Sequence, residues 1–316
     1  MKDFDIYETI TNKIIAQLEE AEKNGSKLPW QKGWIRPQFT TKKIKVKADN
    51  DCCYNGATGR IYSFLNQMLL LKAGAYASFD QIQSMGGKVK KGEKGSFVVF
   101  WKLYKKTEKN AEGEEVEKII PVLKYYTVFH IETQTEGVDE KKIKTPYREA
   151  FEAIETEQVW DNLEECEKLS TMYLEREGIH FSEEAGDRAF YRPMMDSITL
   201  PKRSQFKDAS EWYATLWHEM GHSTGHEKRL NRLSVDARFG DEKYANEELV
   251  AEICSSSMCN IMGIENGSTF KNTVAYIHSW IQALKNDKKL IVTAASKAEK
   301  AVQYIFDGKT ERVEEG

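Results

Sequence analysis

Three of the chain's six histidines lie within nine residues, in the stretch WHEMGHSTGHEKRLNR. His218 and His222 are four residues apart, so on a helix both imidazoles project from the same side. Glu219 follows the first of them, and its carboxylate can take a proton from a water molecule that a metal activates. This HExxH arrangement predicts a zinc site with a general base. Manganese and cobalt are the alternative metals, because intrinsic affinity alone does not select among them.

Two histidines leave zinc under-coordinated, so a third ligand should follow in the sequence. A HExxHxxGxxH pattern would need a histidine three residues after the glycine, where the chain has a lysine. The next helical segment offers Glu248 and Glu252, which are four residues apart and share a side. We expect Glu248 to be the third ligand and Glu252 to accept the outer N–H of His218. Glu247 is the alternative ligand.

His226 follows Gly225, which is expected to end the helix, so it can approach the metal without binding it. We therefore place it beside the site as a supporting residue. As a fourth ligand it would favour a structural metal, since structural zinc sites are closed by four protein ligands. The remaining alternative is an amphipathic helix whose polar histidines bind nothing.

The N-terminal half combines basic with aromatic residues. Between Gln31 and Lys106, lysine and arginine outnumber aspartate and glutamate by 15 to 4, whereas residues 136–316 carry an excess of acidic residues. Rings set in a positive surface are typical of proteins that bind single-stranded nucleic acid. The alternative is that the aromatics fill a core and the lysines form a solvated face. The residues predicted to contact single-stranded DNA are Trp30, Trp34, Arg60, Tyr62, Asn66, Lys88, Lys90, Lys91, Lys94 and Trp101.

The periodicity of apolar residues indicates which elements carry these side chains. Helices are predicted over 4–23, 61–72, 158–177, 208–224, 243–262, 271–284 and 289–306, with a short one at SFDQIQSMGG. Strands are predicted near SFVVFWKLY, VLKYYTVFHI, GIHFSE, RAFYRP and DSITLP. The fold class is therefore α+β in two domains. Residues 1–135 form the DNA-binding domain, 136–157 a linker, and 158–316 a domain whose HExxH helix packs on a small sheet.

Composition excludes several other classes of protein. The five cysteines include no CxxC pair, which argues against a zinc ribbon or a disulfide scaffold and for a reducing, cytoplasmic location. No apolar run approaches the roughly 18 residues that a membrane span needs. The N-terminus lacks the features of a signal peptide, so no membrane partner is expected.

Two sets of segments resemble one family. DIYETITNKIIAQLE, PWQKGW, NGATGRIYSFLNQMLL and GGKVKKGEKGSFVVFWK resemble the N-terminal domain of ArdC-type antirestriction proteins, which is shared with plasmid conjugative primases. WHEMGHSTGHEKRLNR and YANEELVAEICSS resemble the zincin-like metallopeptidase domain of that family.

The resemblance implies an antirestriction protein of a mobile genetic element that binds single-stranded DNA as it enters a new host. It also implies a zinc metallopeptidase-like site at His218, His222 and Glu248, with Glu219 as the base and a host protein as the candidate substrate. Two alternatives stay open. One is a DNA-dependent metalloprotease that acts on DNA-bound proteins, and the other is a single-stranded DNA-binding protein with a structural metal.

Overall fold

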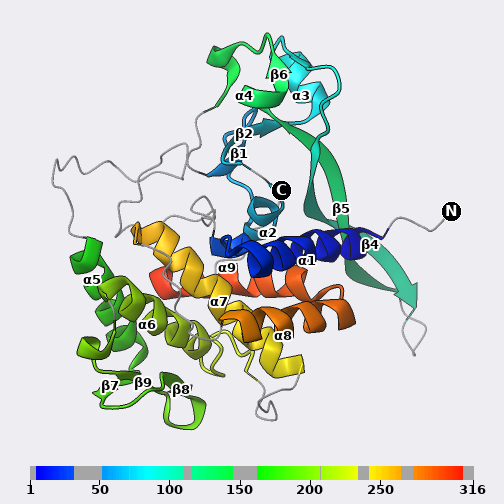
Figure 1. Ribbon diagram of the computed structural model, residues 1–316. Helices are drawn as coiled ribbons and strands as arrows, with labels where there is room; N and C mark the ends of the chain where they lie inside the picture. The colour runs from blue at the N-terminus through cyan, green and yellow to red at the C-terminus, as the bar shows by residue number, and fades with distance from the viewer. Residues whose placement is uncertain are drawn as a thin grey trace.

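The computed structural model describes residues 5–31, 52–70, 72–109, 115–144, 162–206, 208–233, 242–264 and 273–308. The protein is α+β with two domains, which confirms the predicted fold class. Figure 1 shows a helical body from which strands extend along one side. Trp34, which the sequence assigns to DNA contact, lies outside the described residues.

The N-terminal part is built around a sheet of strand order β1–β2–β5–β4. Its elements are α1 (Ile6–Asn24), η1 (Pro29–Gln31), β1 (Cys53–Asn55), α2 (Phe64–Leu69), β2 (Gly74–Ala77), α3 (Phe79–Ser84), β3 (Lys88–Val89), β4 (Ser96–Lys109), β5 (Glu115–His130), α4 (Ile131–Gln134), β6 (Thr135–Glu136) and η2 (Glu140–Lys142). Strands β1 and β2 are parallel, β5 is antiparallel to both of its neighbours, and β3 pairs with β6. The short strands β1, β2, β3 and β6 were not predicted from the sequence.

Strands β4 and β5 form a long hairpin that projects from the helical body (Figure 1). Their antiparallel register places Phe100 opposite Lys124 and Trp101 opposite Leu123. Since successive residues of a strand point to opposite faces, even- and odd-numbered side chains of β4 lie on different sides of the hairpin. Val98 and Val99, near its base, are both buried, so each face is anchored in the body at that end.

The C-terminal part places helices against a small sheet of strand order β7–β9–β8. Its elements are α5 (Asn162–Glu177), β7 (His180–Glu184), β8 (Phe190–Arg192), η3 (Pro193–Met195), β9 (Ser197–Pro201), η4 (Arg203–Gln205), α6 (Ala209–Ser223), α7 (Glu242–Met262), α8 (Thr273–Asn286) and α9 (Leu290–Asp307). These bounds agree closely with the predicted helices and strands. Strand β9 is parallel to β7 and antiparallel to β8.

The main hydrophobic core joins the two parts of the chain. Helix α1 begins at the capping residue Asp5, whose side chain accepts the N–H groups of Tyr7 and Glu8. Its buried stripe packs with α8, and Trp30 of η1 meets Trp280 of α8 edge to face, with ring centroids 5.3 Å apart. The start of the chain is therefore part of the same core as the C-terminal helices.

All five cysteines are buried thiols. Within the described ranges, every helix is too short or too polar to cross a lipid bilayer.

Candidate metal centre

Helix α6 carries the two histidines of the motif. It begins after Asp208, whose side chain accepts the N–H of Glu211 at 2.9 Å and so caps the first turn. Trp217, fully buried, donates its indole N–H to Ser170 of α5 at 3.0 Å. These contacts fix the helix along its length, so His218 and His222 are held by a rigid element.

Two glycines allow α6 and its C-terminal loop to pack closely. A Cβ at Gly221 would lie 3.3 Å from the Cα of Ala251, so the missing side chain lets α7 approach α6. A Cβ at Gly225 would lie 2.9 Å from Leu233 and 3.1 Å from the His222 carbonyl oxygen, so only glycine fits this turn without displacement. Close packing of α7 brings its carboxylates to the histidines.

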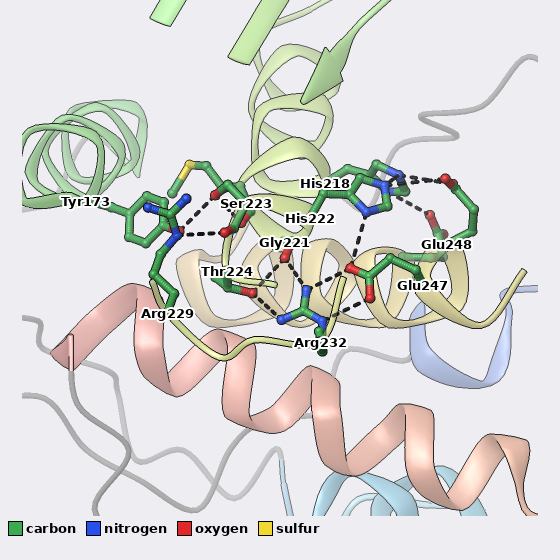
Figure 2. Close-up of polar contacts among 12 residues, drawn as sticks. Tyr173, His218, Gly221, His222, Ser223, Thr224, Arg229, Arg232, Glu247 and Glu248 are labelled. Carbon is green, nitrogen blue, oxygen red and sulfur yellow. Dashed lines mark hydrogen bonds and ion pairs between the residues drawn. The ribbon is translucent and has the colours of Figure 1, made fainter. Parts of the chain in front are cut away.

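His218, His222 and Glu248 come together at this contact, as the sequence predicts (Figure 2). Each offers one ligand atom, and these atoms all lie within 4.8 Å of one another. The Nε2 atoms of the histidines are 3.1 Å apart, and each lies 3.4 Å from a carboxylate oxygen of Glu248. Two imidazole nitrogens and a carboxylate, converging from buried or half-buried positions, form a donor set that fits zinc and neighbouring divalent metals.

The electrostatics of the three groups show how tightly they are coupled. Burial raises the pKa of Glu248, but its contacts with His218 and His222 outweigh burial and hold that pKa well below its ordinary range. Burial lowers the pKa of His222, whereas Glu247 and Glu248 raise it well above its ordinary value. The carboxylates and the imidazoles therefore favour each other's charged forms, which makes this cluster electrostatically strong.

Glu247 supports His222 rather than lying in solvent, which corrects the sequence-based view of this residue as a solvated alternative ligand. Its Oε1 lies 3.4 Å from the outer nitrogen, Nδ1, of His222. Arg232 donates to both oxygens of Glu247, at 3.0 and 2.9 Å, and also bonds Thr224 and the Gly221 carbonyl (Figure 2). The guanidinium thus ties the end of α6 to α7 and fixes the carboxylate behind His222.

Glu252 lies behind the other histidine, with Oε2 3.9 Å from His218 Nδ1. This separation exceeds a direct hydrogen bond, although the position is the one that the sequence predicts. Burial raises the pKa of Glu252, and the nearby indole N–H of Trp30 acts to lower it. The two groups do not meet the geometry of a hydrogen bond. Trp30, from the N-terminal segment, therefore borders the candidate metal centre.

Glu219, the predicted base, is buried on α6, with 7% of its surface exposed. Burial raises its pKa, while the two histidines and the backbone N–H of Tyr191 act to lower it. Tyr191 belongs to strand β8, so the small sheet lies beside this carboxylate. A buried carboxylate with a raised pKa is suited to accepting a proton near neutral pH.

The loop after α6 is fixed by a second arginine that sequence analysis did not single out. Arg229 pairs with Asp196, bonds the Tyr191 hydroxyl at 3.1 Å and donates to the Ser223 carbonyl at 2.7 Å. Asp196 has a positive φ of 45°, so strain in this turn is offset by the ion pair. The two arginines of KRLNR were visible in the sequence, but their partners are distant in the chain.

His226 lies in this loop, where its Nδ1 accepts the N–H of Lys228 at 3.2 Å. Within the described residues, it is not part of the group that converges at His218, His222 and Glu248. The described chain therefore supplies three converging donors, the number typical of metal sites that keep a position for water or substrate.

Three predicted DNA contacts are wrong because the side chains are buried. Trp30 has no exposed surface, since η1, which carries it, packs against α7 and its ring meets Trp280 of α8. Tyr62 is 6% exposed, and Asn66 is held by the backbone of Val99, donating to its carbonyl and accepting its N–H at 2.7 Å each. These residues build the core beneath the sheet.

The remaining predicted contacts lie at or near the surface. Arg60, Lys88, Lys91, Lys94 and Trp101 are exposed, and Lys90 is half-buried. Lys88 forms an ion pair with Glu136 at 3.2 Å, and Lys90 donates to the Thr133 carbonyl at 2.8 Å. Part of the charge in the KVKKGEKG turn is therefore engaged by the protein itself.

The geometry defines a metallopeptidase-like fold, in which a helix bearing HExxH packs between a small sheet and a helix bearing acidic residues. Residues 168–297 match the family described as zincin-like metallopeptidase, and residues 4–129 match the N-terminal domain of the anti-restriction factor ArdC. The chain belongs to the ArdC family of antirestriction proteins.

Solved structures of the family are similar over nearly the whole chain. The metal-free ArdC protein of plasmid R388 has 32% sequence identity and a TM-score of 0.67, covering 98% of this chain and all of that one. The Mn(II)-bound form of that ArdC protein has 29% identity and a TM-score of 0.65, covering 96% of this chain and 97% of that one.

Curated relatives include the DNA primase TraC of Escherichia coli and the uncharacterised protein y4eC of Sinorhizobium fredii. TraC is 33% identical over 98% of this chain, and the matching segment is 20% of TraC. A second TraC is 32% identical, and the match spans 28% of its length. The chain thus spans about a fifth to a quarter of these primases, whereas its match to y4eC, at 30% identity, covers 91% of that protein.

Proposed function

We propose that this antirestriction-family protein holds a divalent metal at His218, His222 and Glu248 and binds single-stranded DNA through its N-terminal half. The convergence of the three ligand atoms within 4.8 Å carries the metal part of the proposal. The Mn(II)-bound relative supports a divalent ion, with zinc the first candidate and manganese or cobalt the alternatives. We assign strand binding to residues 1–135 and metal chemistry to residues 158–316, with residues 136–157 as the linker between them.

The chemistry of such a site is hydrolytic. A divalent ion held there supplies a Lewis acid and lowers the pKa of a water molecule. Glu219 accepts the proton of that water at its carboxylate, and the buried position keeps this base close to the histidines. Glu247 and Glu252 orient the rings of His222 and His218 from behind. The proposed substrate is a peptide bond of a host protein.

Single-stranded DNA is the proposed partner of the N-terminal half because of its charge and its family. Its matched family is the N-terminal domain of an anti-restriction factor, and residues 31–106 are strongly basic. The protein is proposed to come from a mobile element and to act in the reducing cytoplasm, where its buried thiols stay reduced.

A DNA-dependent metalloprotease is a second candidate, favoured by one observation. Trp30 of the N-terminal segment borders Glu252, which lies behind His218. A change in the N-terminal half on binding DNA therefore has a short route to the metal centre. A single-stranded DNA-binding protein with a structural metal is less favoured, because His226 stands apart from the three donors in the described chain.

Metal addition is expected to stabilise the protein. At a free concentration about a thousandfold above the dissociation constant, a ligand of the folded state alone adds about 4 kcal/mol. For a chain of this size, that raises the melting temperature by about 6 °C. Zinc or manganese should produce this shift with about one equivalent bound by elemental analysis, and magnesium, which prefers oxygen ligands, should not. A protein that takes up neither zinc nor manganese would contradict the metal part of the proposal.

Strand binding is expected to weaken steeply with salt. If about four phosphates are neutralised, affinity for an oligothymidylate of about 15 nucleotides should fall about 50-fold between 50 and 200 mM salt. Fluorescence anisotropy measures this with the full chain, and a duplex of equal length is the control. Absence of binding to the oligothymidylate at low salt would refute the strand-binding part.

A further inference from the structure

The β4–β5 hairpin carries an unusual exposed surface. Large rings occupy its outer part in place of the polar residues expected on solvent-facing strands. The exposed fractions are 43% for Phe100, 36% for Trp101, 39% for Tyr104, 47% for Tyr125 and 36% for Tyr126. These side chains lie on a hairpin that projects from the body (Figure 1), where they contribute nothing to the hydrophobic core clusters.

The inner part of this hairpin carries charge of one sign, and its glutamates lie toward the tip, at positions 108, 115 and 117. From Ser96 to Thr107 and from Ile119 to His130 the sequence contains lysines but no aspartate or glutamate. Lys102, Lys105 and Lys124 are all exposed. Exposed rings can stack on bases, and the surrounding lysines can pair with phosphates where no carboxylate repels them. This combination suits a single-stranded nucleic acid.

The two faces of the hairpin differ in how rings and charges are arranged. The register places Phe100, Lys102 and Tyr104 of β4 on one side, opposite Lys124, Val122 and Ile120 of β5, and Tyr126 lies on the same side opposite Val98. We call this the even face. Phe100 meets Tyr126 edge to face at 5.7 Å, and Lys102 and Lys124 lie 5.3 and 5.9 Å from the centroid of Tyr104. Rings and ammonium groups therefore alternate across both strands.

The odd face carries Trp101, Leu103 and Lys105 of β4 with Pro121 and Tyr125 of β5. It holds one described lysine and two aliphatic side chains, and Leu103 is 58% exposed. Its inner end is covered where Val99 and Leu123 join the main core. The odd face offers rings of similar exposure with half of the positive charge, so it serves as an internal comparison.

We infer that the even face is the platform on which single-stranded DNA binds, with bases stacked on Phe100, Tyr104 and Tyr126 and phosphates paired with Lys102 and Lys124. This inference rests on the proposed strand-binding function and assigns it a surface. Phe100 and Tyr104 are four residues apart on one strand, about 13 Å, so successive rings can take separate bases.

Matched double variants of the full chain test the inference. Phe100→Thr with Tyr104→Thr removes two even-face rings, and Leu103→Thr with Tyr125→Thr removes two exposed apolar side chains of the odd face. Threonine retains strand propensity in both. Because each stacked base contributes roughly tenfold or more, the even-face variant should bind a 15-nucleotide oligothymidylate about 100-fold more weakly, and the odd-face variant within about threefold of wild type.

A charge test uses the even-face lysines. Lys102→Gln with Lys124→Gln should reduce the slope of log affinity against log salt by about 1.4, since each phosphate contact on a single strand contributes about 0.7. Lys23→Gln with Lys105→Gln, on α1 and on the odd face, makes the same change of net charge and should leave the slope near that of wild type. Melting temperature and metal content check the fold of every variant, and the lysine pair keeps the test valid if the loss of rings disturbs the hairpin.

Each outcome has one meaning. Equal losses for the even-face variants and their controls, in both the threonine and the lysine experiments, overturn the even-face assignment while leaving strand binding intact. A wild-type protein that does not bind the oligothymidylate overturns the proposed function itself. Tighter binding to duplex than to the single strand also overturns the platform, because paired bases are already stacked and cannot lie on the rings.

Discussion

Replacing His222 by alanine is expected to lower the affinity for zinc or manganese by about two orders of magnitude. Structural zinc sites bind with about 10–16 kcal/mol over four donors, so one donor contributes roughly 3 kcal/mol. Glu247, itself held by Arg232, fixes the ring of His222 from behind, and the substitution also removes this contact. Elemental analysis after gel filtration should show about one metal per wild-type chain and a small fraction of that in the variant.

His226→Ala is the matched control, because it removes the same side chain four residues further on. It should keep the metal, since His226 stands outside the converging group in the described chain. Retention of metal by the His222 variant together with its loss from the His226 variant would show that the assigned ligand set is wrong. The melting temperature without metal checks that both variants are folded.

Glu219→Gln is expected to keep the metal and to reduce hydrolysis by at least about a hundredfold, which is the usual contribution of a general base. The substitution preserves size and hydrogen-bonding atoms while removing the proton acceptor. Burial raises the pKa of Glu219, so the neutral amide avoids the cost of burying a charge and should not lower stability. Cleavage of fluorescein-labelled casein and of the chain itself measures the effect, with and without oligothymidylate.

Glu227→Gln, an exposed change in the loop after α6, is the control for Glu219→Gln and should behave as wild type. Undiminished cleavage by Glu219→Gln would refute its role as base, and a wild-type chain that cleaves nothing in either condition would refute the hydrolytic proposal. Cleavage only in the presence of oligothymidylate would favour the hypothesis of a DNA-dependent metalloprotease over that of an antirestriction protein.

The helices of the metal centre could be predicted because their signals are local. A four-residue spacing puts His218 and His222 on one side of a helix, and the same spacing relates Glu248 and Glu252. The roles of Glu247 and Arg232 could not be read in this way. Their contact joins α7 to a loop fifteen residues earlier, and no periodicity reports such a meeting.

The DNA-binding residues were less predictable because stacking and core packing use the same side chains. Trp30 and Tyr62 occur in a basic, aromatic stretch, yet tertiary contacts bury both. Exposure at Phe100 and Tyr104 depends on a hairpin extending past the body, which sequence alternation alone does not reveal. Strand β2 was missed because Gly74–Ala77 is short and, apart from Tyr76, made of small residues that show no clear alternation.

The core that unites α1 and Trp30 with α7, α8 and α9 has an evolutionary corollary. If recombination replaced one half of the chain with the corresponding half of a distant homologue, Ile10, Ile14 and Trp30 would face a surface that they do not fit. Selection should therefore transmit the two halves together, as a single cassette. The TraC proteins fit this expectation, for they align with 98% of this chain inside a polypeptide several times longer.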